Sequence, residues 1–96
     1  MTPIIVGGSG FVGDHLSKLY ETQNMLPLCA DLTEPARHPI KKFSRWDVRT
    51  PAHSDILRCD FDAVVNLAAI HKSPGHPRQE YFETNILGAR HVCAMA

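Results

Sequence analysis

A glycine-rich stretch that directly follows an apolar run constrains the fold of this chain more than any other feature. Ile4, Ile5 and Val6 are three consecutive β-branched residues, which is typical of a short, buried parallel strand. Glycines follow at once, and apolar residues then recur at helical spacing, at Phe11, Val12, Leu16, Leu19 and Tyr20. The sequence therefore predicts a strand, a tight turn and the N-terminus of a helix, which together form an anion-binding arrangement.

The spacing of the glycines fits two related fingerprints. Gly8-x-Gly10-x-x-Gly13 is the common dinucleotide-binding pattern, and Gly7-x-x-Gly10-x-x-Gly13 is the short-chain dehydrogenase variant. In such turns one glycine permits the sharp bend, another lets a pyrophosphate approach the backbone, and the last lets the helix lie close to the strand. The alternative is a flexible turn that binds nothing. No Lys-Ser or Lys-Thr follows Gly13, so the Walker pattern is absent.

Length and composition limit the chain to one small domain. It has 96 residues, 44% of them hydrophobic, and a formal net charge of zero with scattered basic residues, which excludes an obvious nucleic-acid surface. No apolar run approaches the ~20 residues of a membrane span, and no signal peptide precedes the glycines. We expect a cytoplasmic protein whose residues 1–96 belong to a single dinucleotide-binding domain, without nucleic-acid or membrane partners.

The cysteines and histidines do not form a metal-binding pattern. Cys29, Cys59 and Cys93 are odd in number and contain no C-x-x-C pair, which favours reduced thiols over a disulfide framework. His71 and His76 lie near each other, but no cysteine or carboxylate stands at ligand spacing around them. The sequence predicts no metal.

The rest of the chain alternates between strands and helices. We expect strands over 25–30, 42–46 and 61–69, with a weak helix over 51–59. The first of these strands could instead start at about Leu28, because Pro27 cannot donate a hydrogen bond to a neighbouring strand. A last helix starts near Gln79 and carries an apolar stripe, at Phe82, Ile86, Ala89, Cys93 and Ala96. The pattern predicts an α/β, Rossmann-type doubly wound parallel sheet with about four strands in the order 3-2-1-4.

Two aspartates follow strands of this predicted sheet. Asp31 comes eighteen residues after Gly13, where a dinucleotide fold places the carboxylate that binds the adenosine ribose. That carboxylate would repel a 2′-phosphate, so NAD is favoured over NADP, unless Arg37 or the Lys41-Lys42 pair compensates. Asp47 could accept a hydrogen bond from an adenine amino group. Both aspartates could instead be ordinary strand-end or turn residues.

Small residues end the fourth predicted strand. Ala68 and Ala69 would let a cofactor lie against the backbone at the carboxyl edge of the sheet, where ligands of open α/β sheets bind. The alternative is that these alanines only relieve crowding beneath a helix.

The order of these motifs resembles that of the extended short-chain dehydrogenase/reductase family, in its NAD-dependent epimerase/dehydratase group, which acts on nucleotide sugars. The matching stretches are Gly7-x-x-Gly10-Phe11-x-Gly13, Asp31-Leu32, Asp47-Val48, Val64-Val65-Asn66-Leu67-Ala68-Ala69 and Tyr81-Phe82-x-x-Asn85-Ile86-x-Gly88. The resemblance implies an NAD site made by Gly7, Gly10, Phe11, Val12 and Gly13 at the pyrophosphate, Asp31 and Leu32 at the ribose, Asp47 and Val48 at the adenine, and Leu67, Ala68 and Ala69 along the nicotinamide half. The sequence departs from the family pattern at Val6, because a threonine is frequent there in the family.

The catalytic residues of that family have no counterpart in this chain. The family uses a tyrosine with a lysine four residues later, whereas Tyr20 is followed by Asn24 and Tyr81 by Asn85. We therefore expect no catalytic residue here, although Lys72 and Ser73 could touch the substrate in a longer enzyme or simply be solvated. The last helix reaches Ala96 without a C-cap signal, which predicts a truncated fragment.

Two functions from different classes follow from these observations. The first is the NAD-binding portion of a nucleotide-sugar epimerase, dehydratase or reductase that does not catalyse by itself. The second is a stand-alone dinucleotide-binding or sensing module. A related enzyme acting on a non-sugar carbonyl or a flavonoid-like substrate is a third alternative. The resemblance also implies a homodimer that uses helices such as the one starting near Gln79.

Overall fold

Four short parallel strands form one sheet in the computed structural model, which describes residues 2–34, 42–69 and 75–96. The strands are β1 (Pro3–Val6), β2 (Leu28–Asp31), β3 (Lys42–Arg45) and β4 (Ala63–Asn66), in the spatial order β3-β2-β1-β4. The predicted fold class and strand order are confirmed. Strand β2 starts at Leu28, which leaves Pro27 outside the hydrogen-bonded ladder.

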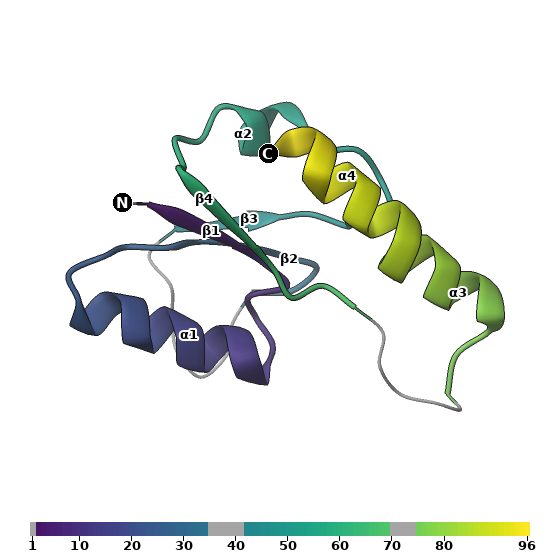
Figure 1. Cartoon of the computed structure of the whole chain (residues 1–96), viewed down its shortest axis with the longest axis horizontal. Helices are drawn as coiled ribbons and strands as arrows, with labels where there is room; N and C mark the ends of the chain where they lie inside the picture. Colours follow the sequence, from purple (N-terminus) through teal and green to yellow (C-terminus); the bar gives the residue numbers. More distant parts are fainter. Residues whose placement is uncertain (1, 35–41, 70–74) are drawn as a thin grey trace.

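The helices cover both faces of this sheet (Figure 1). Helix α1 (Phe11–Thr22) lies on one face. Helix α2 (Ser54–Leu57) and the continuous run of α3 (Arg78–Phe82), the π-helical segment η1 (Glu83–Leu87) and α4 (Gly88–Met95) lie on the other. This two-sided arrangement follows from right-handed crossovers that run in opposite directions from β1.

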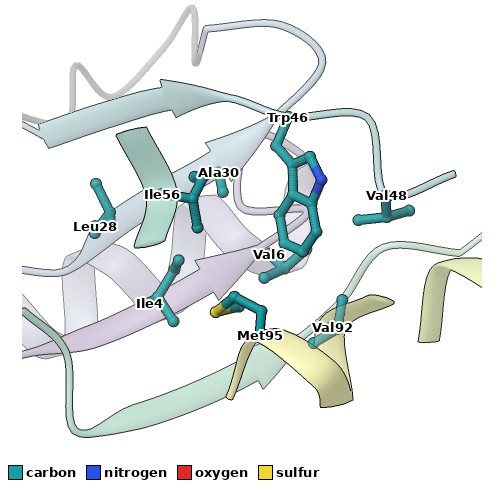
Figure 2. Close-up of a cluster of buried hydrophobic side chains, with 9 residues drawn as sticks. All are labelled: Ile4, Val6, Leu28, Ala30, Trp46, Val48, Ile56, Val92 and Met95. Carbon is teal, nitrogen blue, oxygen red and sulfur yellow. The ribbon is translucent and has the colours of Figure 1, made fainter. Parts of the chain in front are cut away.

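The main core lies between the sheet and the α2–α4 layer. Figure 2 shows its nine buried side chains, from Ile4, Val6, Leu28, Ala30, Trp46, Val48, Ile56, Val92 and Met95. Burial of each large apolar side chain contributes about 1.5–3 kcal/mol relative to exposure. Trp46 and Val48, just beyond β3, join the carboxyl edge of the sheet to α4.

Helix α1 forms where the sequence predicts it, but most of its large apolar side chains face outward. Phe11, Val12 and Leu19 are 68%, 61% and 56% exposed, whereas the buried residues are Gly13, Asp14 and Ser17. Small residues on this face permit the helix to approach the sheet. A Cβ atom on Gly13 would lie 2.4 Å from the carbonyl oxygen of Gly8.

The apolar stripe of the last helix does not face the core. Phe82 and Ile86 are 46% and 48% exposed, Cys93 and Ala96 are also exposed, and Ala89 is half-buried. Gly88, Val92 and Met95 face the core instead. The π-helical segment explains part of the difference, because its wider turn rotates the residues after it relative to the ideal α-helical spacing.

Candidate functional site

A cavity of about 470 Å³ opens at the carboxyl ends of the strands and gathers most of the predicted site. Its lining includes nine of the twelve residues expected to bind a cofactor: Gly7, Gly10, Asp31, Leu32, Asp47, Val48, Leu67, Ala68 and Ala69. A second hollow of about 750 Å³ lies at the amino ends of β1–β3. The first is the better candidate despite its smaller volume, because open α/β sheets bind ligands at the carboxyl ends of their strands.

The glycine turn forms the floor of this cavity. Gly7 has a positive φ of 79°, and its N–H donates to the carbonyl oxygen of Ala30 over 2.7 Å. A Cβ atom on Gly7 would lie only 2.6 Å from the backbone nitrogen of Ala68. The fold itself therefore requires glycine at residue 7.

Gly10 lines the same cavity under different constraints. Its backbone is extended (φ −80°, ψ −177°), a conformation that other residues adopt readily. The nearest heavy atom to a Cβ on Gly10 would be the Gly7 carbonyl oxygen, 3.8 Å away. Neither backbone strain nor packing in the described residues accounts for a glycine here, whereas close approach of a ligand to the backbone would.

Asp31 is fixed at the cavity wall by two backbone donors. Its Oδ2 accepts a hydrogen bond from the N–H of Ser9 over 2.9 Å, and its Oδ1 accepts one from the N–H of Leu32 over 2.6 Å. The Ser9 hydroxyl donates to the carbonyl oxygen of Thr33. These contacts connect the glycine turn to the end of β2, so that the carboxylate and the turn keep one relative position.

Asp47 and Arg49 form an ion pair at another part of the wall. The guanidinium donates from Nε to Oδ1 over 3.0 Å and from a terminal nitrogen to Oδ2 over 2.7 Å, and the backbone N–H of Arg49 also donates to Oδ1. The hydrogen bonds from Arg49 hold the pKa of Asp47 below its usual range. Asp47 therefore keeps its charge, and its acceptor character, in mildly acidic solution.

The segment after β4 supplies the apolar part of the cavity. The N–H of Leu67 donates to the carbonyl oxygen of Val6 over 2.7 Å, which extends the β1–β4 ladder by one residue. The N–H of Ala68 donates to the side chain of Asn66 over 3.1 Å. The short side chains of Ala68 and Ala69 leave this backbone open to the cavity.

A polar wall from α3 and the residues around it was not predicted. His76, Glu80 and Thr84 line the cavity, and Nδ1 of His76 lies 2.8 Å from Oε2 of Glu80. Glu80 lies in α3, whereas His76 precedes this helix and Thr84 lies in η1. The regular spacing of four residues between these polar side chains was available in the sequence as a signal. The other lining residues that sequence reasoning missed are Ala30, Trp46 and Arg49, which adjoin predicted site residues along the chain.

Three of the expected cofactor residues do not line the cavity. Phe11 and Val12 lie in the first turn of α1, where the Phe11 ring contacts the ring of His15 at 4.4 Å between centroids. Gly13 packs against Gly8. Lys72, Ser73 and His71 lie outside the described residues, as do Arg37 and Lys41.

The described residues hold no metal-ligand cluster, and their buried cysteine is not activated. Among residues 2–34, 42–69 and 75–96, no three histidine, cysteine or acidic side chains converge as metal ligands. Cys29 is buried, and burial raises the pKa of its thiol, which disfavours the nucleophilic thiolate. Within those ranges no helix has the length and apolarity needed to cross a bilayer.

Comparison with known proteins shows the family of the chain. Residues 4–96 match the family described as "NAD dependent epimerase/dehydratase family". A curated relative from Escherichia coli O157:H7, N-acetyl-alpha-D-glucosaminyl-diphospho-ditrans,octacis-undecaprenol 4-epimerase, is 33% identical over 92 residues, which are 95% of this chain and 27% of the relative. The chain thus spans about a quarter of that relative's length.

Solved structures agree with this assignment at the level of the fold. The UDP-glucose 4-epimerase of Stenotrophomonas maltophila, solved with NAD and formylated UDP-arabinopyranose, superposes with a TM-score of 0.79 at 21% identity, over 99% of this chain and 33% of that one. An NAD-dependent NDP-hexosamine 5,6-dehydratase involved in tunicamycin biosynthesis gives a TM-score of 0.76 at 27% identity, over 99% and 33%. The chain belongs to the NAD-dependent epimerase/dehydratase family, as the order of its motifs predicted.

Proposed function

We propose that this chain is the NAD-binding portion of an epimerase or dehydratase acting on a nucleotide-linked sugar, and that it does not catalyse by itself. The cavity supports the first part, because a glycine turn, two fixed carboxylates and an open apolar backbone meet at the carboxyl edge of the sheet. The second part rests on the sequence, in which neither tyrosine is followed four residues later by a lysine. The E. coli relative's name supports a diphosphate-linked sugar as substrate of the complete enzyme.

In this proposal the chain's own residues hold the two halves of the cofactor. The glycine turn and the first N–H groups of α1 bind the pyrophosphate, because helix N-termini attract anions. Asp31 accepts hydrogen bonds from the adenosine ribose, and Asp47 accepts one from the adenine amino group. Bound NAD would supply hydride acceptance, while Leu67, Ala68 and Ala69 would bring the nicotinamide half against the backbone.

The observation that carries the proposal is the empty space around Gly10. A Cβ atom at this position is compatible with the backbone and with its protein neighbours, so we expect the fold to tolerate a side chain here. A cofactor pyrophosphate lying on that backbone would leave no room for a side chain at residue 10. Replacement of Gly10 therefore separates ligand binding from folding.

The experiment measures the melting temperature and NAD affinity of the wild-type chain, Gly10→Val and Leu19→Ala. Leu19 is exposed on α1 and does not line the cavity, so Leu19→Ala is a control for disturbing this helix. We expect NAD to raise the melting temperature of the wild type and of Leu19→Ala, since a ligand that binds the native state stabilises it. Gly10→Val should fold and show no NAD-dependent shift. Undiminished NAD affinity in folded Gly10→Val would contradict the proposal.

A further inference from the structure

Arg45 lies beside the carboxylate that the proposed function assigns to the ribose. Asp31 and Arg45 are register partners on the parallel strands β2 and β3. Side chains alternate between the two faces along each strand, so those of paired residues leave the sheet on the same face. Two opposite charges thus end neighbouring strands, and of the two Asp31 lines the cavity.

The side chain of Arg45 bends toward the end of β2. Its guanidinium donates a hydrogen bond to the carbonyl oxygen of Leu32 over 2.5 Å. Leu32 lines the cavity and directly follows Asp31. The guanidinium of Arg45 is therefore bound next to Asp31, at the residue that follows it. Its partner there is a neutral carbonyl oxygen, which does not compensate the positive charge of Arg45.

Asp31 is held in place by contacts that do not involve Arg45. Both of its carboxylate oxygens accept hydrogen bonds from backbone N–H groups, those of Ser9 and Leu32. Replacing Arg45 would leave these two contacts in place. The contributions of the two side chains to ligand binding can therefore be separated by mutation.

We propose that Arg45 is a second determinant of cofactor choice, placed to pair with the 2′-phosphate of NADP, and that Asp31 opposes it. This inference rests on the proposed function. Dinucleotide folds place a carboxylate against the ribose 2′-hydroxyl of NAD or an arginine near the 2′-phosphate of NADP. The planar guanidinium suits phosphate oxygens, with which it forms charge-assisted, often bidentate hydrogen bonds. This chain holds both groups at one edge.

The test is a titration of four proteins with NAD and with NADP at low salt: the wild type, Arg45→Met, Asp31→Asn and the double variant. Arg45→Met should weaken NADP binding about tenfold, the usual scale of one charge-assisted hydrogen bond, and change NAD affinity less than about twofold. Asp31→Asn should strengthen NADP binding, and adding Arg45→Met should remove that gain. Arg58→Met is the matched control, because Arg58 is an exposed arginine whose partners, Asp55 and Ser54, do not line the cavity.

The outcomes separate this inference from the proposed function. If the wild type binds NAD but Arg45→Met leaves NADP affinity unchanged with and without Asp31→Asn, Arg45 has no role in cofactor choice. Failure of the wild type to bind either dinucleotide would overturn the proposed function itself. Asp31→Asn removes one acceptor from the Ser9 and Leu32 N–H groups and could unfold; the comparison of wild type with Arg45→Met then decides alone, because Arg45 is exposed.

Discussion

Nδ1 of His91 lies 2.7 Å from the carbonyl oxygen of Val48, and this hydrogen bond connects helix α4 to the wall of the cavity. Since a carbonyl oxygen only accepts, the imidazole donates from Nδ1. The two residues are 43 positions apart in the sequence. Val48 lines the cavity and also belongs to the core, so the contact with His91 of α4 stabilises the cavity wall on its core side.

Loss of this hydrogen bond should loosen the cavity wall. His91→Phe leaves a partly buried carbonyl without its donor, and we expect a loss of about 1 kcal/mol in the free energy of unfolding, together with weaker NAD binding. His91→Asn is the matched control, because its side-chain N–H can occupy the position of Nδ1. Chemical denaturation and calorimetric titration measure the two effects. Equal stability of His91→Phe and the wild type would show that the contact contributes nothing.

Gly13 should respond to substitution in the opposite way to Gly10. A Cβ atom on Gly13 would lie 2.4 Å from a backbone oxygen of Gly8, so α1 must move away from the turn. We expect Gly13→Ala to lower the free energy of unfolding by about 1–3 kcal/mol, as overpacking does. Denaturant unfolding of the two variants side by side measures this. A stable Gly13→Ala beside an unfolded Gly10→Val would reverse the assignment of the two glycines.

The ion pair of Asp47 and Arg49 predicts a pH dependence of stability. The pKa of Asp47 is lowered in the folded chain, so its contribution is fully present above its unfolded pKa, near 3.8, and is lost as the pH falls through the folded value. Arg49→Met should move the pKa of Asp47 upward, toward the unfolded value. The wild type should therefore lose more stability than Arg49→Met between about pH 5 and pH 2. NMR titration of the Asp47 carboxyl carbon measures the pKa directly, and identical midpoints would contradict the account.

Ser17 is a position where the native residue costs stability. Its hydroxyl is fully buried against the sheet and finds no hydrogen-bond partner among the residues that the structure describes. Ser17→Ala should raise the free energy of unfolding by about 1 kcal/mol, because it removes a desolvated polar group from a site that accepts a small side chain. Thermal melts of Ser17→Ala and of Ser54→Ala, an exposed serine, provide the comparison. A lower melting temperature for Ser17→Ala would reveal a hydrogen bond made by this hydroxyl.

The strands, their order and the position of the cavity could be predicted because the signals are local. An apolar run such as Ile4 to Val6 is typical of a buried strand in a small α/β domain, and the glycines after it mark the turn that follows the strand. The positions of Asp31 and Asp47 then follow from the strands. Parallel strands bring their carboxyl ends to one edge, where all four contribute lining residues or their immediate successors.

The buried faces of the helices could not be predicted in the same way. Helix α1 and the run from α3 to α4 carry large apolar residues on the outside, such as Phe11 and Phe82, while small residues such as Ser17 and Gly88 are buried. Close approach selects the buried face of α1, whereas α4 buries Val92 and Met95 together with Gly88. The distances that decide both faces depend on the assembled fold. Thr84 reaches the cavity from the π-helical segment, for which the sequence pattern gave no signal.

Amide mapping with NAD tests the central claim most directly. In ¹⁵N-labelled chain, addition of NAD should shift the amide resonances of the residues around the carboxyl-edge cavity, namely Gly7, Gly10, Asp31, Val48 and Ala68, and leave those of Leu28, Phe43 and Asp60 at the amino-edge hollow unchanged. Saturable shifts confined to the first group are the predicted result. Shifts confined to the amino-edge hollow, or none at saturating NAD, would contradict the assignment of this cavity as the cofactor site.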